Sequence, residues 1–242
     1  MWKERWTTLV DKIQIVGSED DERKLLDSLA RLGPSRVLAF VNAHAMNYCA
    51  EDSKFFDAIA SGDVLLRDGS GMALLYKHAG RNAGRNMNGT DFIPKIIATF
   101  RGRKLALWGT EEPFLAQAVL RCEQEFGARV ISREDGFQDF EHYLALARDT
   151  QPELIVLAMG MPKQEQLARA LREQGGGPLI VCGGAILDFL GGKVSRAPAM
   201  LRSAGMEWLY RLAKEPGRLF KRYVLGNPAF LLKVLTWTRQ KS

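Results

Sequence analysis

Apolar residues recur along this chain in two alternating patterns. Short continuous runs rich in Val, Ile and Leu predict buried strands, at residues 36–42, 104–109, 128–132, 152–160 and 178–184, with shorter ones at 13–16 and 63–66. Apolar residues at helical spacing predict helices at residues 43–62, 70–78, 91–100, 110–126, 137–150 and 161–174. Strands that alternate with helices in this way predict βαβ units, and therefore an α/β, Rossmann-like parallel sheet flanked by helices.

Local signals suggest where some elements begin. The first 30 residues have the character of a charged segment that holds one short strand and one helix. Thr90 and Thr110 each precede a helical pattern and are expected to be its N-cap. Asn227 is expected to cap the last helix, with Pro228 in its first turn.

The chain divides at about residue 194, where the composition changes. Residues 193–242 contain eleven Lys or Arg and two Asp or Glu, a net charge of +9, whereas the other 192 residues carry −3. We therefore expect an α/β core over 1–194 and a basic helical appendage over 195–242, with helices near 200–216, 217–226 and 228–240. Such a block favours a polyanionic partner: nucleic acid, an anionic lipid surface or ligand phosphates. Its interleaved aromatic residues suit a membrane interface.

Other signals limit the compartment and the cofactors. The three cysteines are scattered and form no C-x-x-C pair, and the three histidines are isolated, so neither a zinc site nor a disulfide framework is indicated. No secretory signal and no apolar run of spanning length is present. We expect a cytoplasmic protein without a metal or other cofactor.

Ligands of an open parallel sheet bind beyond the carboxyl ends of its strands. The strands predicted here end in Asn42, Asp68, Gly109, Gly160 and Gly183. Glycine at such a turn allows a ligand close to backbone N–H groups, although a tight turn alone would also explain it. Neither a Walker loop nor a dinucleotide fingerprint is present, which argues against a P-loop kinase or a dehydrogenase.

Asp68 lies in the sequence "LLRDGSG", between a predicted strand and a predicted helix. Its carboxylate could cap the helix that follows. Alternatively, a carboxylate at the mouth of a cleft, beside glycines that leave room for substrate, could act as a general base. The local sequence alone leaves both interpretations open.

An ordered set of motifs carries a family resemblance. The set is "VNA" at 41–43, "RDGSGM" at 67–72, "NGTDF" at 88–92, "MGMPKQE" at 159–165, "GGAILDFLGG" at 183–192, "SRAP" at 195–198 and "GMEWLYRLAKEPGRLFKRY" at 205–223. In these motifs the chain resembles the WecG/TagA/CpsF glycosyltransferases (glycosyltransferase family 26). The resemblance implies an inverting, metal-independent transfer of a sugar from a UDP-sugar to a polyprenyl-pyrophosphate-linked sugar, in bacterial surface polysaccharide synthesis. It also implies a peripheral enzyme on the inner face of the plasma membrane.

The same resemblance assigns expected roles to single residues. Asp68 would be the catalytic base and Asn42 would lie near the donor sugar, while Gln164 and Asp188 would line the nucleotide pocket. The remaining expected contacts are arginines that meet the diphosphates, namely Arg211, Arg218 and Arg222. Arg196 would either share that role or brace the start of the appendage.

The chain departs from the family pattern at two places. Many members have an arginine where this chain has Asn86, and Arg85 could replace it. Many also have a hydroxyl residue before the asparagine of the first motif, where this chain has Phe40 and Val41. Because both positions bear on the donor, UDP-N-acetylmannosamine, UDP-glucose and a UDP-uronic acid all remain candidates.

The strongest competing interpretation is a nucleic-acid-binding α/β protein that uses the basic appendage. Leucines and aromatic residues at helical spacing in that segment favour a membrane surface over a nucleic-acid groove, so we expect no nucleic-acid partner. Assembly of identical chains is left open, since exposed aromatic residues can be covered by a neighbour.

Overall fold

The computed structural model describes residues 1–198, 200, 201 and 205–237, apart from the side chain of Arg218. Its centre is one sheet of seven strands in the order β1-β3-β2-β7-β6-β4-β5, and every pairing is parallel. The strands are β1 (Ile13–Gln14), β2 (Arg36–Val41), β3 (Val64–Arg67), β4 (Lys104–Gly109), β5 (Arg129–Glu134), β6 (Leu154–Ala158) and β7 (Leu179–Cys182). The α/β fold predicted from the apolar pattern is confirmed.

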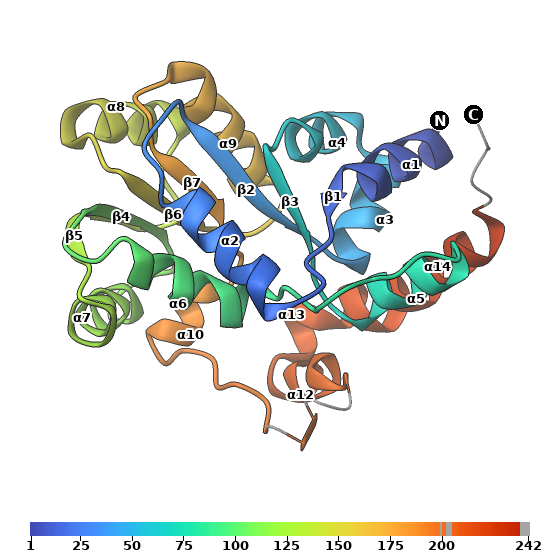
Figure 1. The fold of residues 1–242 in the computed structure, drawn as a ribbon. Coiled ribbons are helices and arrows are strands. Elements are labelled where there is room, and N and C mark those ends of the chain that lie inside the picture. The colour runs from blue at the N-terminus through green and yellow to red at the C-terminus, as the bar shows by residue number, and fades with distance from the viewer. Residues whose placement is uncertain (199, 202–204, 238–242) are drawn as a thin grey trace.

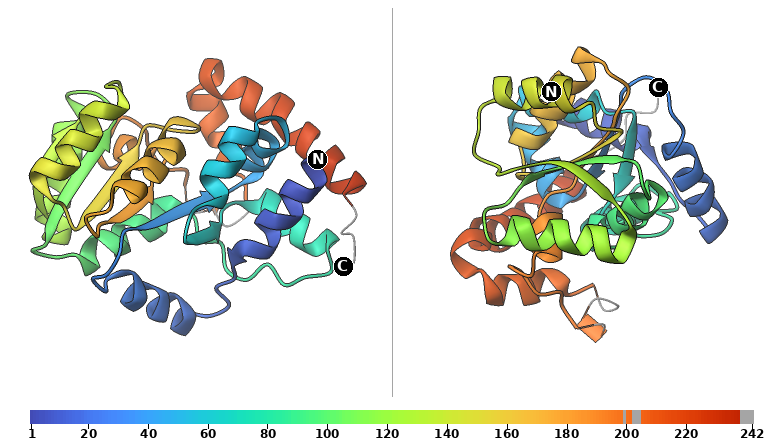
Figure 2. Two further views of the ribbon diagram at one scale, coloured as in Figure 1. Left: turned by 90° about the horizontal axis from the view of Figure 1, so that it is seen from above. Right: turned by 90° about the vertical axis from the view of Figure 1, so that its left-hand side faces the viewer.

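Helices cover both faces of this sheet (Figures 1 and 2). One face packs on α1 (Trp2–Lys12), α3 (Ala43–Glu51), α4 (Ser53–Ala60), α5 (Ser70–His78), α8 (Phe140–Thr150) and α9 (Lys163–Gln174). The other packs on α2 (Glu19–Leu29), α6 (Gly89–Thr99), α7 (Phe114–Phe126) and α10 (Ile186–Leu190).

Burial on both faces explains why the strands lack a polar alternation. In β2, Val37, Ala39 and Val41 belong to the cluster on one face, while Leu38 and Phe40 belong to the cluster on the other. Each central strand therefore contributes to two hydrophobic cores.

Residues 2–12 form a helix that the sequence analysis did not predict. Helix α1 buries Trp6, Leu9 and Val10. The Trp6 ring lies 5.4 Å from that of Phe230 and 6.4 Å from that of Trp237, between ring centroids. The two ends of the described chain thus share one core cluster.

Three of the predicted caps are wrong. Asn88 rather than Thr90 caps α6, with its Oδ1 accepting from the Asp91 N–H at 3.0 Å. Helix α7 begins after Pro113, and Thr110 lies four residues earlier at φ +56°. The last helix begins at Gly226, directly after a π-helical turn, so Asn227 lies inside it.

Beyond the core, the chain forms α12 (Glu207–Lys214), α13 (Pro216–Phe220), the π-helical turn η1 (Lys221–Leu225) and α14 (Gly226–Thr236). Figure 1 shows α14 running beside α5. Phe230, Val234 and Trp237 are buried against the core, whereas Leu232 and Leu235 are 65% and 68% exposed. Within the described residues, no helix combines the length and apolarity needed to cross a membrane.

Candidate active site

The candidate residues come together at the carboxyl edge of the sheet. Asn42 follows β2, Asp68 follows β3, Gly109 ends β4, Gly160 follows β6 and Gly183 follows β7. Since β3, β2, β7, β6 and β4 are consecutive neighbours in the sheet, these five ends form one continuous row. The chain leaves β4 toward β5 on one side and leaves β6 toward β7 on the other, so the connections diverge between β4 and β6. Open α/β sheets bind ligands in the crevice at such a switch point.

Asp68 lies at one end of this row and does not cap a helix. Its backbone N–H continues the pairing with β2 by donating to Val41 O at 2.9 Å. Its Oδ2 accepts from Asn42 Nδ2 at 3.3 Å. The N-cap of α5 is Gly69, and that helix has no side-chain cap. The capping interpretation of Asp68 is therefore wrong, and the residue is half-buried.

The glycines around Asp68 have separate roles. Gly69 has φ +89°, which favours glycine, and a Cβ there would meet no atom within 4 Å. The space beside the carboxylate is therefore open. Gly71 instead allows close packing, because a Cβ there would lie 3.1 Å from Ala43 Cβ and 3.3 Å from the Phe230 ring.

Burial raises the pKa of Asp68, and four groups oppose that rise. They are the hydrogen bond from Asn42 and, through their charges, Arg222, Arg211 and Arg67. A carboxylate whose pKa is raised is a stronger base than an ordinary aspartate, while the cations keep its charged form accessible. Asn42 also accepts from Ala45 N at 3.0 Å, so one side chain both caps α3 and orients Asp68.

In the loop between α5 and α6, Asn86 and its candidate replacement Arg85 point to different places. Arg85 points away from Asp68 and forms ion pairs with Glu19 and Glu22 on α2, at 3.3 and 3.5 Å. Asn86 lies at the candidate site, where its Oδ1 accepts from Gly69 N at 2.7 Å. A neutral carboxamide therefore lies beside the turn that carries Asp68, and the guanidinium of Arg85 lies against α2 instead.

At the other end of the row, Gln164 braces two glycine turns. It is only 2% exposed, and its Oε1 accepts from Gly160 N at 3.2 Å and from Gly184 N at 3.0 Å. Its Nε2 donates to Glu165 Oε1 at 2.7 Å. With its amide engaged in this way, Gln164 holds the glycine turns after β6 and β7 in place.

Glycines allow close packing of the backbone at the carboxyl ends of β4 and β6. A Cβ at Gly109 would lie 2.3 Å from Ala158 O, and one at Gly136 would lie 3.4 Å from Gly109 Cα. Thr110, which follows Gly109, donates its hydroxyl to Asp188 Oδ1 at 2.5 Å. Thr110 therefore orients Asp188 from across the crevice, a contact that the sequence did not reveal.

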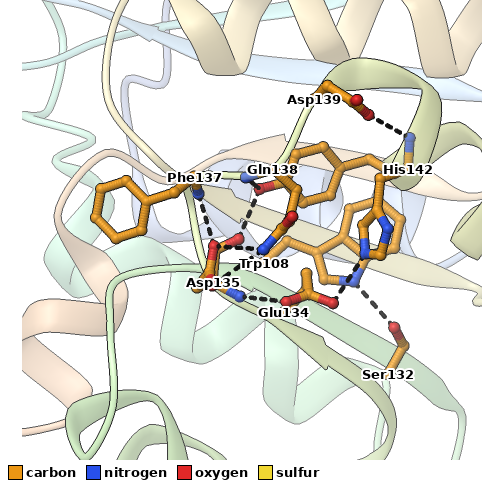
Figure 3. A network of polar contacts seen from close by, with 9 residues as sticks. Trp108, Ser132, Glu134, Asp135, Phe137, Gln138, Asp139 and His142 are labelled. Atoms are coloured by element: carbon orange, nitrogen blue, oxygen red, sulfur yellow. Dashed lines mark hydrogen bonds and ion pairs between the residues drawn. The ribbon is translucent and has the colours of Figure 1, made fainter.

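A hydrogen-bonded loop beyond β5 exposes Phe137, a residue that the sequence analysis did not single out. Figure 3 shows the network that holds the loop, in which Asp135 Oδ1 accepts from Phe137 N at 2.8 Å and Glu134 contacts His142 at 2.9 Å. Lys163 also donates to the carbonyls of Gly136 and Gln138. The Phe137 ring projects away from the network and is 75% exposed. In the sequence, the available signal was a phenylalanine among the polar and glycine residues of "DGFQD", where a loop is expected.

The arginines of the C-terminal segment differ in their surroundings. Arg211 lies over the Phe189 ring at 5.3 Å, and Arg222 is close enough to lower the pKa of His44, which burial above all brings to about 4. Both arginines also act on Asp68. Arg196 forms an ion pair with Asp91 at the start of α6, the bracing arrangement. The side chain of Arg218 lies outside the part that the structure describes.

Among the described residues, no three His, Cys, Asp or Glu side chains gather in a way that could hold a metal ion.

Comparisons with known proteins agree on one family. The model of the "Glycosyl transferase WecG/TagA/CpsF family" matches residues 11–242. An N-acetylglucosaminyldiphosphoundecaprenol N-acetyl-beta-D-mannosaminyltransferase of Bacillus subtilis (strain 168) is 25% identical over 210 residues, which cover 85% of this chain and 81% of the relative. A protein with the same name from Bacillus spizizenii (strain ATCC 23059 / NRRL B-14472 / W23) is 25% identical over 194 residues, covering 78% and 74%.

Proposed function

The chain belongs to the WecG/TagA/CpsF glycosyl transferase family, and from that premise we propose that it moves a sugar from a UDP-sugar to a polyprenyl-diphosphate-linked sugar. The names of the two Bacillus relatives support such an acceptor. The observation that carries the chemistry is Asp68, a half-buried residue whose carboxylate has a raised pKa, is oriented by Asn42 and lies within reach of the charges of Arg211 and Arg222.

In the proposed reaction, Asp68 accepts the proton of the acceptor hydroxyl. The hydroxyl oxygen forms a bond to the anomeric carbon while the bond from that carbon to the diphosphate oxygen breaks. The bonding electron pair leaves with UDP. A single displacement of this kind inverts the anomeric centre, and it needs one base and one means of stabilising the leaving group.

Cationic side chains would stabilise the departing diphosphate. Arg211 of α12 and Arg222 of the π-helical turn belong to the C-terminal segment, and both act on Asp68 through their charges. Guanidinium groups bind phosphate oxygens in a bidentate manner, which suits a leaving group with two phosphates. The sequence holds no D-x-D motif, and we propose that these arginines serve in place of a divalent cation.

The nucleotide would occupy the crevice between β4 and β6. The fixed Asp188 carboxylate offers a partner for a nucleobase N–H, and the exposed Phe137 ring offers a partner for a nucleobase face. The donor sugar would then extend along the row of strand ends toward Asp68.

We also propose that the protein docks on an anionic membrane surface through its C-terminal helices. Leu231, Leu232 and Leu235 of α14 are exposed, as are Phe220 and Leu225 just before it. The net charge of +9 over residues 193–242 suits an anionic lipid surface. A lipid-linked acceptor would be presented at that surface.

The test is the substitution Asp68→Asn, assayed for UDP release with a panel of UDP-sugars and a short-chain polyprenyl-diphosphate sugar. We expect transfer to fall by about a hundredfold or more, with UDP still bound, because the amide cannot accept the proton. Asp27→Asn, an equally small change at an exposed position of α2, serves as the control. Near-normal transfer by Asp68→Asn would overturn the proposal, and the panel identifies the donor.

A further inference from the structure

We propose that Arg67 is a positioning residue for the transfer reaction, because it joins the catalytic turn and the loop between α5 and α6 into one rigid unit. This inference rests on the proposed role of Asp68 and goes beyond it. Arg67 ends β3, directly before Asp68, yet its side chain points to the loop and is only 5% exposed.

The guanidinium of Arg67 donates to three backbone carbonyls. Its Nε donates to Ala83 O at 2.8 Å, its Nη1 to Gly69 O at 3.0 Å and its Nη2 to Gly84 O at 3.0 Å. Two of these carbonyls belong to the loop, and the third belongs to the turn that carries Asp68. A planar fork with fixed donors can make this set of contacts, whereas the single ammonium of a lysine cannot reach all three.

The turn depends on these contacts for its shape. Gly69 is the N-cap of α5, and this helix has no side-chain cap. Its N–H donates to Asn86 Oδ1 and its carbonyl accepts from Arg67, so both polar groups of this residue are held by the loop system. Without them, a glycine at φ +89° beside open space could rotate and carry the Asp68 carboxylate with it.

The loop itself is fixed at its far side. Arg85 N donates to Val16 O at 2.7 Å, and Met87 N donates to Arg67 O at 3.0 Å. A Cβ at Gly84 would lie 2.5 Å from Val16 O, so the backbone is pressed against the segment after β1. Arg67 thus connects the turn that carries Asp68 to a loop that is itself held by backbone hydrogen bonds. A general base has to be held in a defined orientation of this kind.

Arg67 also places a positive charge next to Asp68. The other groups that act on the Asp68 carboxylate are Asn42 after β2, Arg211 of α12 and Arg222 of the π-helical turn. Loss of the Arg67 charge should raise the pKa of Asp68 and so move the acid limb of the kcat/KM profile to higher pH. A lysine at this position should leave that limb in place, because the charge is kept, but should no longer hold the Asp68 carboxylate in its orientation.

The experiment compares Arg67→Lys and Arg67→Ala with Arg148→Lys, an exposed arginine of α8, as the control. We expect Arg67→Lys to lower kcat by about tenfold to a hundredfold with little change in UDP affinity, because the nucleotide crevice lies at the other end of the strand row. Arg67→Ala should lose at least as much activity and show the shifted acid limb. Millimolar guanidinium should restore part of its kcat.

A second variant covers the event that Arg67→Ala does not fold. Asn86→Ala removes the other anchor of Gly69 from an exposed side chain, and we expect it to lower kcat severalfold without shifting the acid limb, since no charge is lost. Asp68→Asn is measured beside these variants. If Asp68→Asn is inactive while Arg67→Lys and Asn86→Ala retain wild-type kcat, the inference about Arg67 is wrong and the proposed function stands. If Asp68→Asn is active, the proposed function itself fails.

Discussion

Glu165 should make the stability of this protein depend on pH in an unusual direction. The residue lies on α9 and is 2% exposed. One carboxylate oxygen accepts from Gln164, and the other, Oε2, is buried without a hydrogen-bond partner among the described residues. The nearby ionisable groups are the buried thiols of Cys49 and Cys182, and neither supplies a positive charge.

Burial raises the pKa of Glu165 from its ordinary value of 4.5 to about 7. Between those two pH values the folded state holds a proton that the unfolded state has released, so the free energy of unfolding falls as pH rises through this window. Since one pKa unit corresponds to about 1.4 kcal/mol, the ionised carboxylate costs on the order of 3 kcal/mol above pH ~7.

Glu165→Gln removes the charge and keeps the shape. We expect the free energy of unfolding of the variant, relative to that of the unmodified protein, to increase by about 3 kcal/mol between pH ~4 and pH ~8. Urea titrations at a series of pH values measure this difference directly. Glu123→Gln, at an exposed position of α7, controls for the loss of one negative charge.

The reasoning fails if the difference between Glu165→Gln and the unmodified protein is flat with pH. It also fails if the difference has the opposite sign, with the variant losing relative stability as pH rises. That result would mean that the carboxylate is better stabilised in the folded state than in water.

Three further outcomes are expected. Phe230→Ala should lower the free energy of unfolding by about 3–5 kcal/mol in urea titrations, because it removes a buried ring that packs on Trp6; a change below about 1 kcal/mol would contradict that packing. Phe137→Ala should weaken UDP binding about fivefold or more in calorimetry, with unchanged stability, since its exposed ring is expected to stack on the base. The double substitution Leu232→Gln and Leu235→Gln should reduce sedimentation with anionic vesicles while leaving the melting temperature unchanged; full vesicle binding would exclude α14 as the contact.

The sequence predicted the sheet better than the ends of the chain, for a physical reason. Strand burial on both faces leaves a continuous apolar run that can be identified locally. Helix α1, in contrast, places Trp6 among charged neighbours, and its apolar side has a partner only because Phe230 and Trp237 pack on it from more than two hundred positions away. Through that contact, α14 belongs to the same core cluster as α1. A truncation at residue 195 would therefore expose Trp6 in addition to removing Arg211 and Arg222.

Helix starts were mispredicted where a better hydrogen bond lay nearby. Thr90 has the right chemistry for a cap, but Asn88 reaches the Asp91 N–H first and fixes the start two residues earlier. Thr110 instead uses its hydroxyl on Asp188, which arrives from after β7 and cannot be anticipated from the residues around it. In both cases a competing hydrogen bond decided where the helix begins. The Asn88 bond is local in the sequence, whereas the Thr110 bond to Asp188 is not.

The candidate site shows the same division. Asn42 and Asp68 could be brought together from the sequence, because the carboxyl ends of neighbouring parallel strands must share an edge. The sequence could not show whether Arg85 or Asn86 faces the site. Adjacent residues in a loop point in different directions, and a loop has no periodicity from which those directions can be predicted. Three distant contacts settle it: Glu19 and Glu22 draw Arg85 to α2, Arg67 holds the loop carbonyls, and Gly69 engages Asn86. Of these two loop residues, the one beside the turn that carries Asp68 is therefore the neutral Asn86.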